Sequence, residues 1–351
     1  MRGLACCLLA LGAAAAARAE PYIALQNGLS CGGCHVNVTG GGARNTFGSG
    51  VGRQALPWFR PEDPHKELWD GAIGERLRIG ADLRASYLGH LRADDPYLGE
   101  YTLSTGTLYV TAELLPERLV LYADEQLAGG AASRELFALY RTHAAGLYAK
   151  AGKFFLPYGL RLQDDEAFTR RVTDFNFDES DVGFEVGAEP GSFSLQAAVT
   201  NGSAGGSERD NGKMVSASAG YVRPAWRVGL SAANNDLPGS VKRSLAGLFG
   251  GFRAGPIVGL YEVDVIREYS LDAPRSTDAV SHAEIDATLR RGLDLRFWAG
   301  KARPDRQLGV GADWTALPGV QLRGWYRRRD GPRGVGGRRD DEAAIEVHVY
   351  F

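Results

Sequence analysis

The chain contains very little cysteine. Only 4 of its 351 residues are cysteines, and two of these lie in an apolar N-terminal run, residues 4–17. The run is followed by small residues of the kind that signal peptidase cleaves, which predicts a signal peptide over residues 1–19 and an exported chain. That exported chain keeps Cys31 and Cys34 alone, so a disulfide between any other pair is excluded.

Two further absences narrow the class of protein. After residue 19, no stretch offers the ~20 continuous apolar residues that a membrane helix requires. An excess of one charge is also missing, since 40 Lys and Arg balance 42 Asp and Glu, which gives no reason to expect a nucleic-acid partner. The exported chain is therefore either soluble or a membrane protein that crosses with β-strands.

The residues that are abundant favour β-structure. The chain has 47 glycines, 14 tyrosines and 6 tryptophans but only 2 methionines, which is typical of a protein rich in strands, turns and aromatic belts. From about Glu75 onwards, short segments alternate apolar and polar residues. In residues 293–298, for example, Leu295 and Phe297 lie on one face and Arg296 on the other. Charged residues at alternate positions indicate that one face of the sheet is wet.

The lengths of the connections predict the architecture. We count about 16 strands, joined alternately by short and long links, and this is the pattern of short periplasmic turns and long outer loops in outer-membrane barrels. An even count places both chain ends in the periplasm. Short turns are expected at residues 115–117, 144–146, 190–191, 223–225, 254–256, 291–292 and 317–319. Long links are expected near residues 90–100, 128–133, 155–180, 201–212, 235–243, 268–279, 302–306 and 329–340.

The last strand adds to this prediction. Residues 343–351 alternate strictly, with Ile345, Val347 and Val349 on one face, and the chain stops at an aromatic residue, Phe351. This ending resembles the C-terminal signal that the outer-membrane assembly machinery recognises. The alternative is a periplasmic β-sandwich, which also alternates but seldom needs so many regularly linked strands. We predict an all-β fold, a transmembrane antiparallel β-barrel over residues 72–351.

The third long link carries a cluster of charges. In porin-like barrels the third outer loop commonly folds into the lumen, and here opposite charges in the loop would face one another across such a constriction and select ions. The residues expected at this constriction are Arg161, Arg170 and Arg171 on one side and Asp164, Asp165 and Glu166 on the other. A solvated outer loop is the alternative. The preceding "GKFFLPYGL" resembles a strand-end motif of the phosphate-selective porin family, but that family's arginine ladder is missing, so anion selectivity is not implied.

The two remaining cysteines form a Cys-x-x-Cys-His motif, Cys31 to His35. This is the attachment site of a c-type haem. Two thiols three positions apart on one turn can reach the two vinyl groups of a porphyrin, and the adjacent histidine then binds the iron as its proximal ligand. Attachment takes place after export, which agrees with the predicted signal peptide. We therefore predict one covalent haem c on a short irregular segment, residues 20–71.

The motif has three alternative interpretations. A disulfide between Cys31 and Cys34 is compatible with an oxidising compartment but makes no use of His35. A thioredoxin-like redox site needs a βαβ scaffold, whereas the flanking residues are glycine-rich and loop-like. A zinc site needs four ligands, and only three lie nearby.

The residues around the motif resemble a known haem segment. The stretch from Leu29 to Phe47, with "CHVNVTGGGARN" at its centre, is similar to the N-terminal haem segment of a family of outer-membrane barrel proteins of Gram-negative bacteria. The resemblance implies that residues 40–42, Arg44 and Asn45 form a tight backbone wrap near the haem. Three glycines permit such a wrap, and Arg44 is suited to pair with a haem propionate. A flexible linker with an exposed arginine is the alternative.

The rest of the haem's surroundings is harder to predict. The segment is too short to enclose a haem, so Trp58, Phe59 and Trp69 are candidates for apolar walls, together with the mouth or lumen of the barrel; ordinary packing against the barrel is the alternative. His65 is the nearest candidate for the sixth iron ligand. The more distant candidates are Met214, His90, His143 and His282. Bis-histidine ligation would suit electron transfer, and an open iron would suit small-molecule binding.

The predicted function is electron transfer at the outer membrane. One haem near one face cannot conduct across the ~30 Å apolar layer alone, so periplasmic or outer-membrane cytochromes are expected as partners. The alternative is a diffusion porin for small solutes or ions, plugged or gated by the haem segment. An enzyme is not expected, since no distal acid–base group is apparent. A homotrimer in outer-membrane lipid is expected by analogy with porins.

Overall fold

The computed structural model describes most of the chain from Glu20 onwards. The described residues are 20–60, 62, 69–92, 97–128, 132–142, 146–176, 179–206, 211–237, 241–270, 274–331 and 340–351. The predicted signal peptide lies outside the described residues, and so do His65 and His143.

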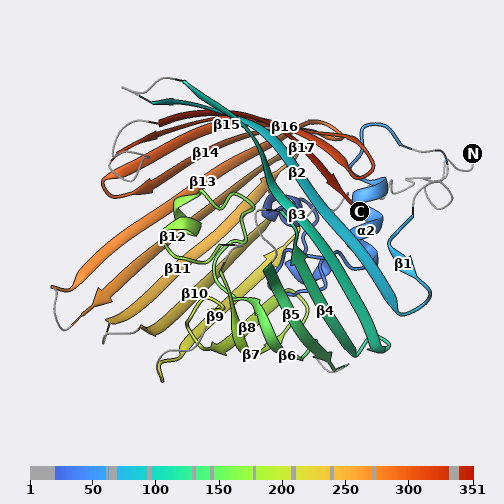
Figure 1. The fold of residues 1–351 in the computed structure, drawn as a ribbon, viewed down its shortest axis with the longest axis horizontal. Helices are drawn as coiled ribbons and strands as arrows, with labels where there is room; N and C mark the ends of the chain where they lie inside the picture. The colour runs from blue at the N-terminus through green and yellow to red at the C-terminus, as the bar shows by residue number, and fades with distance from the viewer. Residues whose placement is uncertain are drawn as a thin grey trace, which may run out of the picture.

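Sixteen antiparallel strands close into a barrel, which confirms the predicted fold (Figure 1). Each strand pairs with its neighbours along the chain, and the last strand pairs with β2 to complete the ring. A further short strand, β1 (Ala72–Ile73), pairs with the beginning of β2. The barrel strands are β2 (Leu77–Arg92), β3 (Leu98–Leu115), β4 (Leu119–Gln126), β5 (Ala132–Arg141), β6 (Tyr148–Phe155), β7 (Ser180–Ala188), β8 (Phe193–Thr200), β9 (Met214–Arg223), β10 (Trp226–Leu237), β11 (Val241–Ala254), β12 (Ile257–Tyr269), β13 (Ser276–Arg290), β14 (Leu293–Ala302), β15 (Asp305–Leu317), β16 (Val320–Asp330) and β17 (Asp340–Tyr350). Within the described part of the chain, no helix is long and apolar enough to cross a membrane.

The short turns fall where the sequence predicts them. Turns at residues 115–117, 190–191, 223–225, 254–256, 291–292 and 317–319 join consecutive strands, while most of the predicted turn at 144–146 lies outside the described residues. Two predicted long links are wrong. Only residues 303–304 separate β14 from β15, and β10 and β11 extend until three residues separate them. Polar residues such as Asn235 suggested a loop there, but beyond the apolar zone both faces of a strand are free to be polar.

The strands place apolar residues outside and polar residues inside. In β17, Ile345 is 68% exposed and Glu346 is 5% exposed. Leu83 and Arg84 of β2 show the same contrast. An outward apolar surface on a closed barrel is suited to contact with lipid chains, and the charged residues therefore face the lumen.

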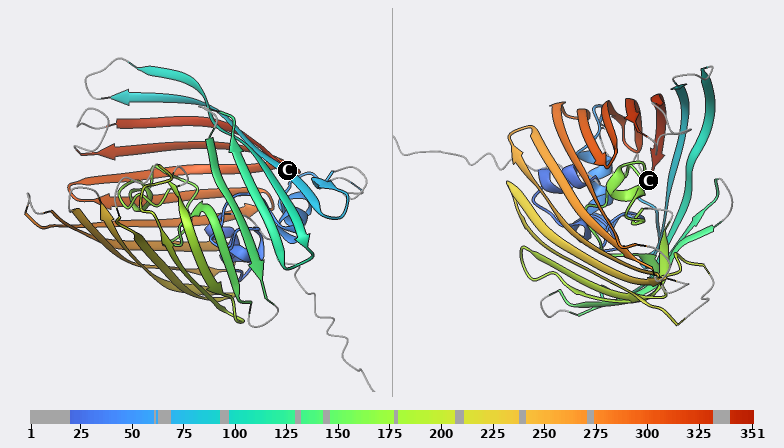
Figure 2. Two further views of the ribbon diagram at one scale, coloured as in Figure 1. Left: turned by 60° about the horizontal axis from the view of Figure 1, so that its bottom comes forward. Right: turned by 90° about the vertical axis from the view of Figure 1, so that its left-hand side faces the viewer.

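The lumen is occupied by two segments of the chain. One is the N-terminal segment, with α1 (Pro21–Gln26), a 3₁₀ turn, η1 (Cys31–Gly33), and α2 (Thr46–Gln54). The other is the loop between β6 and β7, which contains α4 (Phe168–Arg171) and is called here the inner loop, residues 156–179. Figure 2 shows both within the ring of strands, and α1 contacts β11 and β12 while α4 contacts β12, β13 and β14. The prediction that this loop folds into the lumen is confirmed.

The N-terminal segment meets the barrel at the end that carries the short turns. Trp58 N donates a hydrogen bond to Thr315 O at 2.9 Å, and Arg291 Nε donates to Pro57 O at 3.0 Å. The C-terminus and β1 lie at this same end (Figure 1). The end of the N-terminal segment and the C-terminus therefore lie on one side of the barrel.

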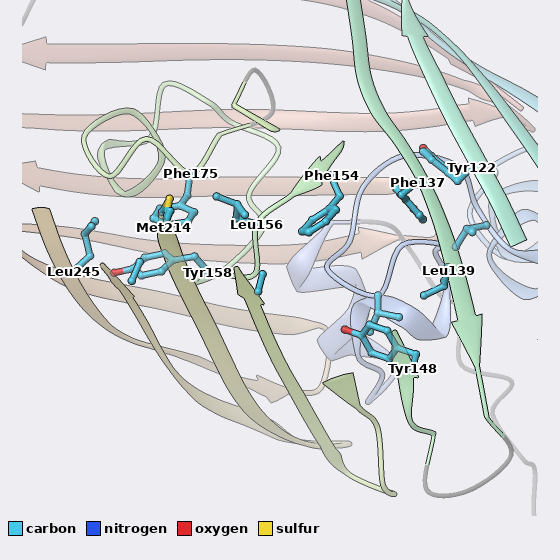
Figure 3. Close-up of a cluster of buried hydrophobic side chains, with 14 of the residues drawn as sticks. Tyr122, Phe137, Leu139, Tyr148, Phe154, Leu156, Tyr158, Phe175, Met214 and Leu245 are labelled. Atoms are coloured by element: carbon cyan, nitrogen blue, oxygen red, sulfur yellow. The ribbon is translucent and has the colours of Figure 1, made fainter. Parts of the chain in front are cut away.

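Apolar side chains fill much of the space that an open porin would leave to water. One buried cluster joins Val36 and Val38 of the N-terminal segment to Tyr122, Phe137 and other residues of the barrel wall, and continues into the inner loop (Figure 3). A second cluster joins α1 to the inner loop and to β11 and β12. This second cluster consists of Tyr22, Ile23, Leu25, Leu160, Leu162, Ala167, Phe249, Val258 and Leu260. The two inner segments and the wall thus share buried apolar contacts.

The inner loop is also held by a buried ion pair. Arg170 Nη2 lies 2.6 Å from Glu262 Oε1 of β12, and both side chains are fully buried. A buried charge that loses its partner is strongly destabilising. We expect Arg170→Met to lower the free energy of unfolding by about 3–5 kcal/mol, because Glu262 would remain buried without its counter-charge. Urea unfolding of the purified barrel in detergent micelles measures this.

Arg171→Met is the matched control. Arg171 is the next residue, and its pair with Glu166 is exposed on both sides, at 42% and 47%. Exposed pairs contribute about 0–1 kcal/mol, so we expect little change in stability. Equal losses in the two variants would show that the buried pair does not anchor the inner loop.

Candidate functional site

A cavity inside the lumen brings the Cys-x-x-Cys-His motif against the barrel wall. It is lined by Cys31, Cys34 and His35, by glycines 40–42 and Arg44, and by side chains of the barrel and inner loop. The cavity volume is about 140 Å³, within a surrounding region of about 1270 Å³ that includes crevices between side chains and open solvent. The apolar and aromatic part of its lining comes from Ile23, Leu56, Tyr109, Phe155 and Tyr350.

The two cysteines occupy a single helical turn. The amides of Cys34 and His35 both donate to Cys31 O, at 3.1 and 3.0 Å, which closes the turn over η1. Both thiols are free. Burial raises the pKa of the Cys34 thiol to about 11 and also raises the pKa of Cys31. A redox-active dithiol needs a lowered thiol pKa, so this environment is unlike that of a thioredoxin-type site.

His35 presents one nitrogen without a partner. Its Nδ1 lies 3.3 Å from Gly42 O, which can only accept, so Nδ1 carries the proton. Its Nε2 is buried and has no hydrogen-bond partner among the described residues. Burial, with Arg44 nearby, lowers the pKa of His35 to about 4, so the ring is neutral at physiological pH. A neutral ring held in this way has a lone pair on Nε2. This nitrogen is the atom that would bind a metal.

The three glycines shape the wrap that the sequence suggests. Gly40, Gly41 and Gly42 have φ values of 99°, 82° and 65°, in the left-handed region that favours glycine. The wrap returns the chain so that His35 and Arg44 form an isolated antiparallel bridge. A Cβ on Gly42 would overlap the Tyr122 hydroxyl. The glycines therefore serve both the turn and close contact with β4.

Asn45 joins the wrap to α2. Its side-chain oxygen accepts from Gly48 N at 2.9 Å and caps the helix. Its amide nitrogen donates to Gly32 O and Gly33 O, each at 3.2 Å. One side chain thus connects the cysteine turn to the helix that follows.

A buried polar network attaches the wrap to the wall. Asn37 Nδ2 donates to Glu135 Oε1 at 2.6 Å, and Asn37 Oδ1 accepts from Lys150 Nζ at 3.0 Å. Lys150 also pairs with Glu185 at 2.9 Å, and Thr39 reaches Glu185 at 3.4 Å. All five side chains are buried. Sequence reasoning missed this network, and its only signal was a set of charges at inward positions of β5, β6 and β7.

Arg44 and Arg161 both line the cavity. The Arg44 guanidinium lies 4.2 Å from the centre of the Tyr350 ring. Arg161 Nη2 donates to Leu156 O at 2.8 Å. Burial, with Arg170 nearby, lowers the pKa of Arg161 to about 10, so the group remains cationic at neutral pH. The role of Arg44 toward a propionate stays a prediction.

The charges of the inner loop pair chiefly with the wall. Asp164 lies 2.7 Å from Arg327, and Glu166 lies 3.0 Å from Arg329, both on β16. Burial alone would raise the pKa of Asp164, but Arg327 beside it lowers the pKa below its usual value.

The pairing differs from the predicted constriction. Asp165 lines the cavity with Arg161, and Arg170 pairs with β12. The sequence predicts that the arginines and the carboxylates of this loop face one another. Arg171 and Glu166 do so as a direct ion pair, at 3.1 Å. A role of these residues in ion selection stays a prediction.

The tryptophans and Phe59 do not form haem walls. Trp58 packs edge-on against Trp314, Phe59 is 56% exposed, and Trp69 lies against Phe351. None of the three lines the cavity. These three residues instead pack at the short-turn end of the barrel. The aromatic lining of the cavity comes from the barrel strands.

The described candidates for a sixth iron ligand, His90, His282 and Met214, lie apart from the motif. His90 is 3.4 Å from Asp340, and His282 is 3.4 Å from Glu284; neither lines the cavity. Met214 lines a different cavity. The structure instead places His348 of β17 in the cavity, a residue that the sequence did not single out. Among the described residues, no group of three or more His, Cys, Asp or Glu is arranged to hold a metal ion.

Comparisons with known proteins identify the fold. No family model matches the chain, and no curated protein matches it in sequence. Among solved structures, OmpT, an outer-membrane protein of Vibrio cholerae recorded in a trimer form, is similar with a TM-score of 0.61 at 13% identity, over 78% of this chain and 99% of that one. An anion-selective porin from Comamonas acidovorans gives 0.62 at 9% identity, over 78% and 99%. OprB of Pseudomonas putida gives 0.61 at 10% identity, over 79% and 94%. The chain therefore has the fold of porin-like outer-membrane barrels.

The glycine wrap can be tested by adding one methyl group. We expect Gly42→Ala to lower the free energy of unfolding by about 1–3 kcal/mol, because φ is positive there and the Cβ meets Tyr122. Gly50→Ala is the control, since nothing lies within 4 Å of its added Cβ and the position is in α2. That control should be neutral or slightly stabilising. Urea unfolding compares the two, and equal effects would contradict the assigned geometry.

Proposed function

We propose that this barrel carries one covalent haem c inside its lumen and transfers electrons at the outer membrane. The observation that supports this most directly is the buried Nε2 of His35, which has no partner among the described residues and belongs to a motif with two free thiols. In the proposal, Cys31 and Cys34 hold the haem by thioether bonds and His35 binds its iron. When bound, the haem supplies a one-electron Fe(III)/Fe(II) couple.

The residues of the cavity suit that group. Aromatic and aliphatic side chains of the barrel and α1 provide apolar contact, while Arg44 and Arg161 provide cationic groups for carboxylates. Burial keeps His35 neutral, which is the form that binds iron. The chain's own part is to bind and orient the group and to limit its contact with water; the proposal contains no chemical step on a substrate.

The position of the cysteine motif within the barrel suggests which proteins could exchange electrons with it. By the usual rule for such barrels, the short turns and the cysteine motif lie on the periplasmic side of a Gram-negative outer membrane. One redox centre cannot span the ~30 Å apolar layer, so the proposal includes periplasmic or outer-membrane cytochromes as partners. A homotrimer, the form recorded for the Vibrio OmpT, is the assembly that we propose in outer-membrane lipid.

A second candidate is a gated diffusion channel for small solutes or ions. The comparisons favour this function over electron transfer, because their names include porins and an anion-selective porin. The N-terminal segment would then act as the plug. Its attachment through hydrogen bonds and a shared apolar cluster supports a closed resting state, and opening would require the segment to move.

A haem assay tests the first candidate. The mature protein is purified from outer membranes of a host that matures c-type cytochromes and is examined by alkaline pyridine haemochrome assay. We expect one c-type haem per chain in the wild type and loss of covalent haem when both Cys31 and Cys34 are replaced by alanine, since no other thiol remains in the exported chain. Folding of the variant is checked by its gel mobility with and without heating. A wild-type protein without haem would refute electron transfer by this route.

Single-channel recording in a planar bilayer tests the second candidate. We expect low conductance from the intact protein, because two segments occupy the lumen. Deletion of residues 20–56 should raise the conductance severalfold. The control is Gly50→Ala, which leaves the segment in place. If the deletion variant folds as a barrel with unchanged low conductance, the segment is not the plug.

A further inference from the structure

A second histidine faces the cavity that contains the cysteine motif. His348 lies on β17, the strand that closes the barrel, and is only 4% exposed. It lines the cavity together with His35, although 313 positions separate them. We infer that His348 is the sixth ligand of the haem iron. This inference rests on the proposed haem and adds the identity of the residue that completes its coordination.

Elimination among the described residues favours His348. Of the four histidines that the structure describes, His90 and His282 do not line this cavity, and Met214 lines another one. Tyr109 and Tyr350 line the cavity too, but a phenol must lose a proton before it binds iron, whereas a neutral imidazole already offers a lone pair. The remaining nitrogen ligand in the cavity is His348.

The neighbours of His348 fix which nitrogen is available. Its Nδ1 lies 3.1 Å from Gln321 Oε1, and because an amide oxygen only accepts, Nδ1 is the donor. In the neutral ring, Nε2 then carries the lone pair and accepts from Arg84 Nη2 at 3.4 Å, while Asp82 Oδ1, 3.2 Å away, favours a proton on the same nitrogen. This is the arrangement in which a metal-binding histidine is oriented by a hydrogen bond from its other nitrogen.

Binding of iron at Nε2 would displace the two present contacts of this nitrogen. Arg84 Nη2 lies 3.4 Å from Nε2, and Asp82 Oδ1 lies 3.2 Å from it. Asp82 and Arg84 are paired with each other twice, at 3.0 and 3.1 Å, so each keeps a counter-charge when Nε2 binds iron. The exchange leaves no buried charge without a partner.

Ligation by His348 would also connect the two ends of the chain. The ring centres of Tyr350 and His348 lie 4.8 Å apart on the inward face of β17. The Arg44 guanidinium lies 4.2 Å from the centre of the Tyr350 ring. The N-terminal segment already touches β17 at this point. The iron would thus link the N-terminal segment to the strand that closes the barrel. Such a link would make the site rigid, which suits an electron carrier.

The spectrum of the iron tests this inference. In the haem-loaded wild type we expect a low-spin, six-coordinate iron by EPR and optical spectroscopy. His348→Ala should retain one c-type haem per chain by haemochrome assay but become high-spin, and its affinity for added imidazole should rise by at least about tenfold because no internal ligand competes. His282→Ala is the matched control, a buried lumen histidine outside the cavity, and should keep the wild-type spectrum.

The outcomes separate the inference from the function on which it rests. An unchanged low-spin spectrum in His348→Ala overturns the sixth ligand and leaves the haem protein standing. A wild type without haem overturns both. If the alanine variant fails to fold, His348→Met replaces it: a low-spin iron with a raised reduction potential supports ligation at this position, and an unaltered potential refutes it.

Discussion

The hydrogen bonds between β17 and β2 are the constraint on which the rest of the structure depends. Eleven residue pairs, from Asp340–Arg92 to Tyr350–Asp82, join the last barrel strand to the first. Without them the sheet would have two open edges, and an apolar layer offers no water to satisfy the exposed amides and carbonyls. Closure therefore permits an outward apolar surface, and it creates an interior that is separated from lipid.

The charged side chains of the strands face this interior, because the outer surface of the barrel is apolar. Period-two alternation places a polar side chain inside at every second position, and the two inner segments cover these side chains. Their charges are balanced in groups: Arg296 lies within 3.5 Å of Glu20, Glu284 and Asp313, and Arg323 shares two of these carboxylates. Glu20 belongs to the N-terminal segment, so the segment is part of the charge balance of the wall. The N-terminal segment and the barrel are consequently one electrostatic unit.

The sequence was sufficient for the parts that depend on local pattern. Alternation along each strand, the turn residues and the terminal aromatic residue predict the barrel, and one helical turn explains the spacing of Cys31 and Cys34. The contacts that complete the site join residues distant in sequence, such as Asn37 with Lys150, and nothing local reveals them. The inward charges were visible, but their partners were not. For that reason Arg161, Arg170 and Asp164 suggested a constriction, whereas the structure attaches Arg170 to β12 and Asp164 to β16.

In the proposed function, a short segment holds a large ligand because the barrel takes the place of a separate domain. A free-standing segment of this length would need its own core, and small chains bury too little surface to form one. Inside the lumen, Tyr109, Phe155 and Tyr350 line the cavity, and Lys150 and Glu135 hold the segment through the side chain of Asn37. The side chains that enclose the cavity would also obstruct a solute in the proposed channel. The proposed haem site and an open channel therefore need the same space in the lumen. The N-terminal segment would have to move for the barrel to change from one to the other.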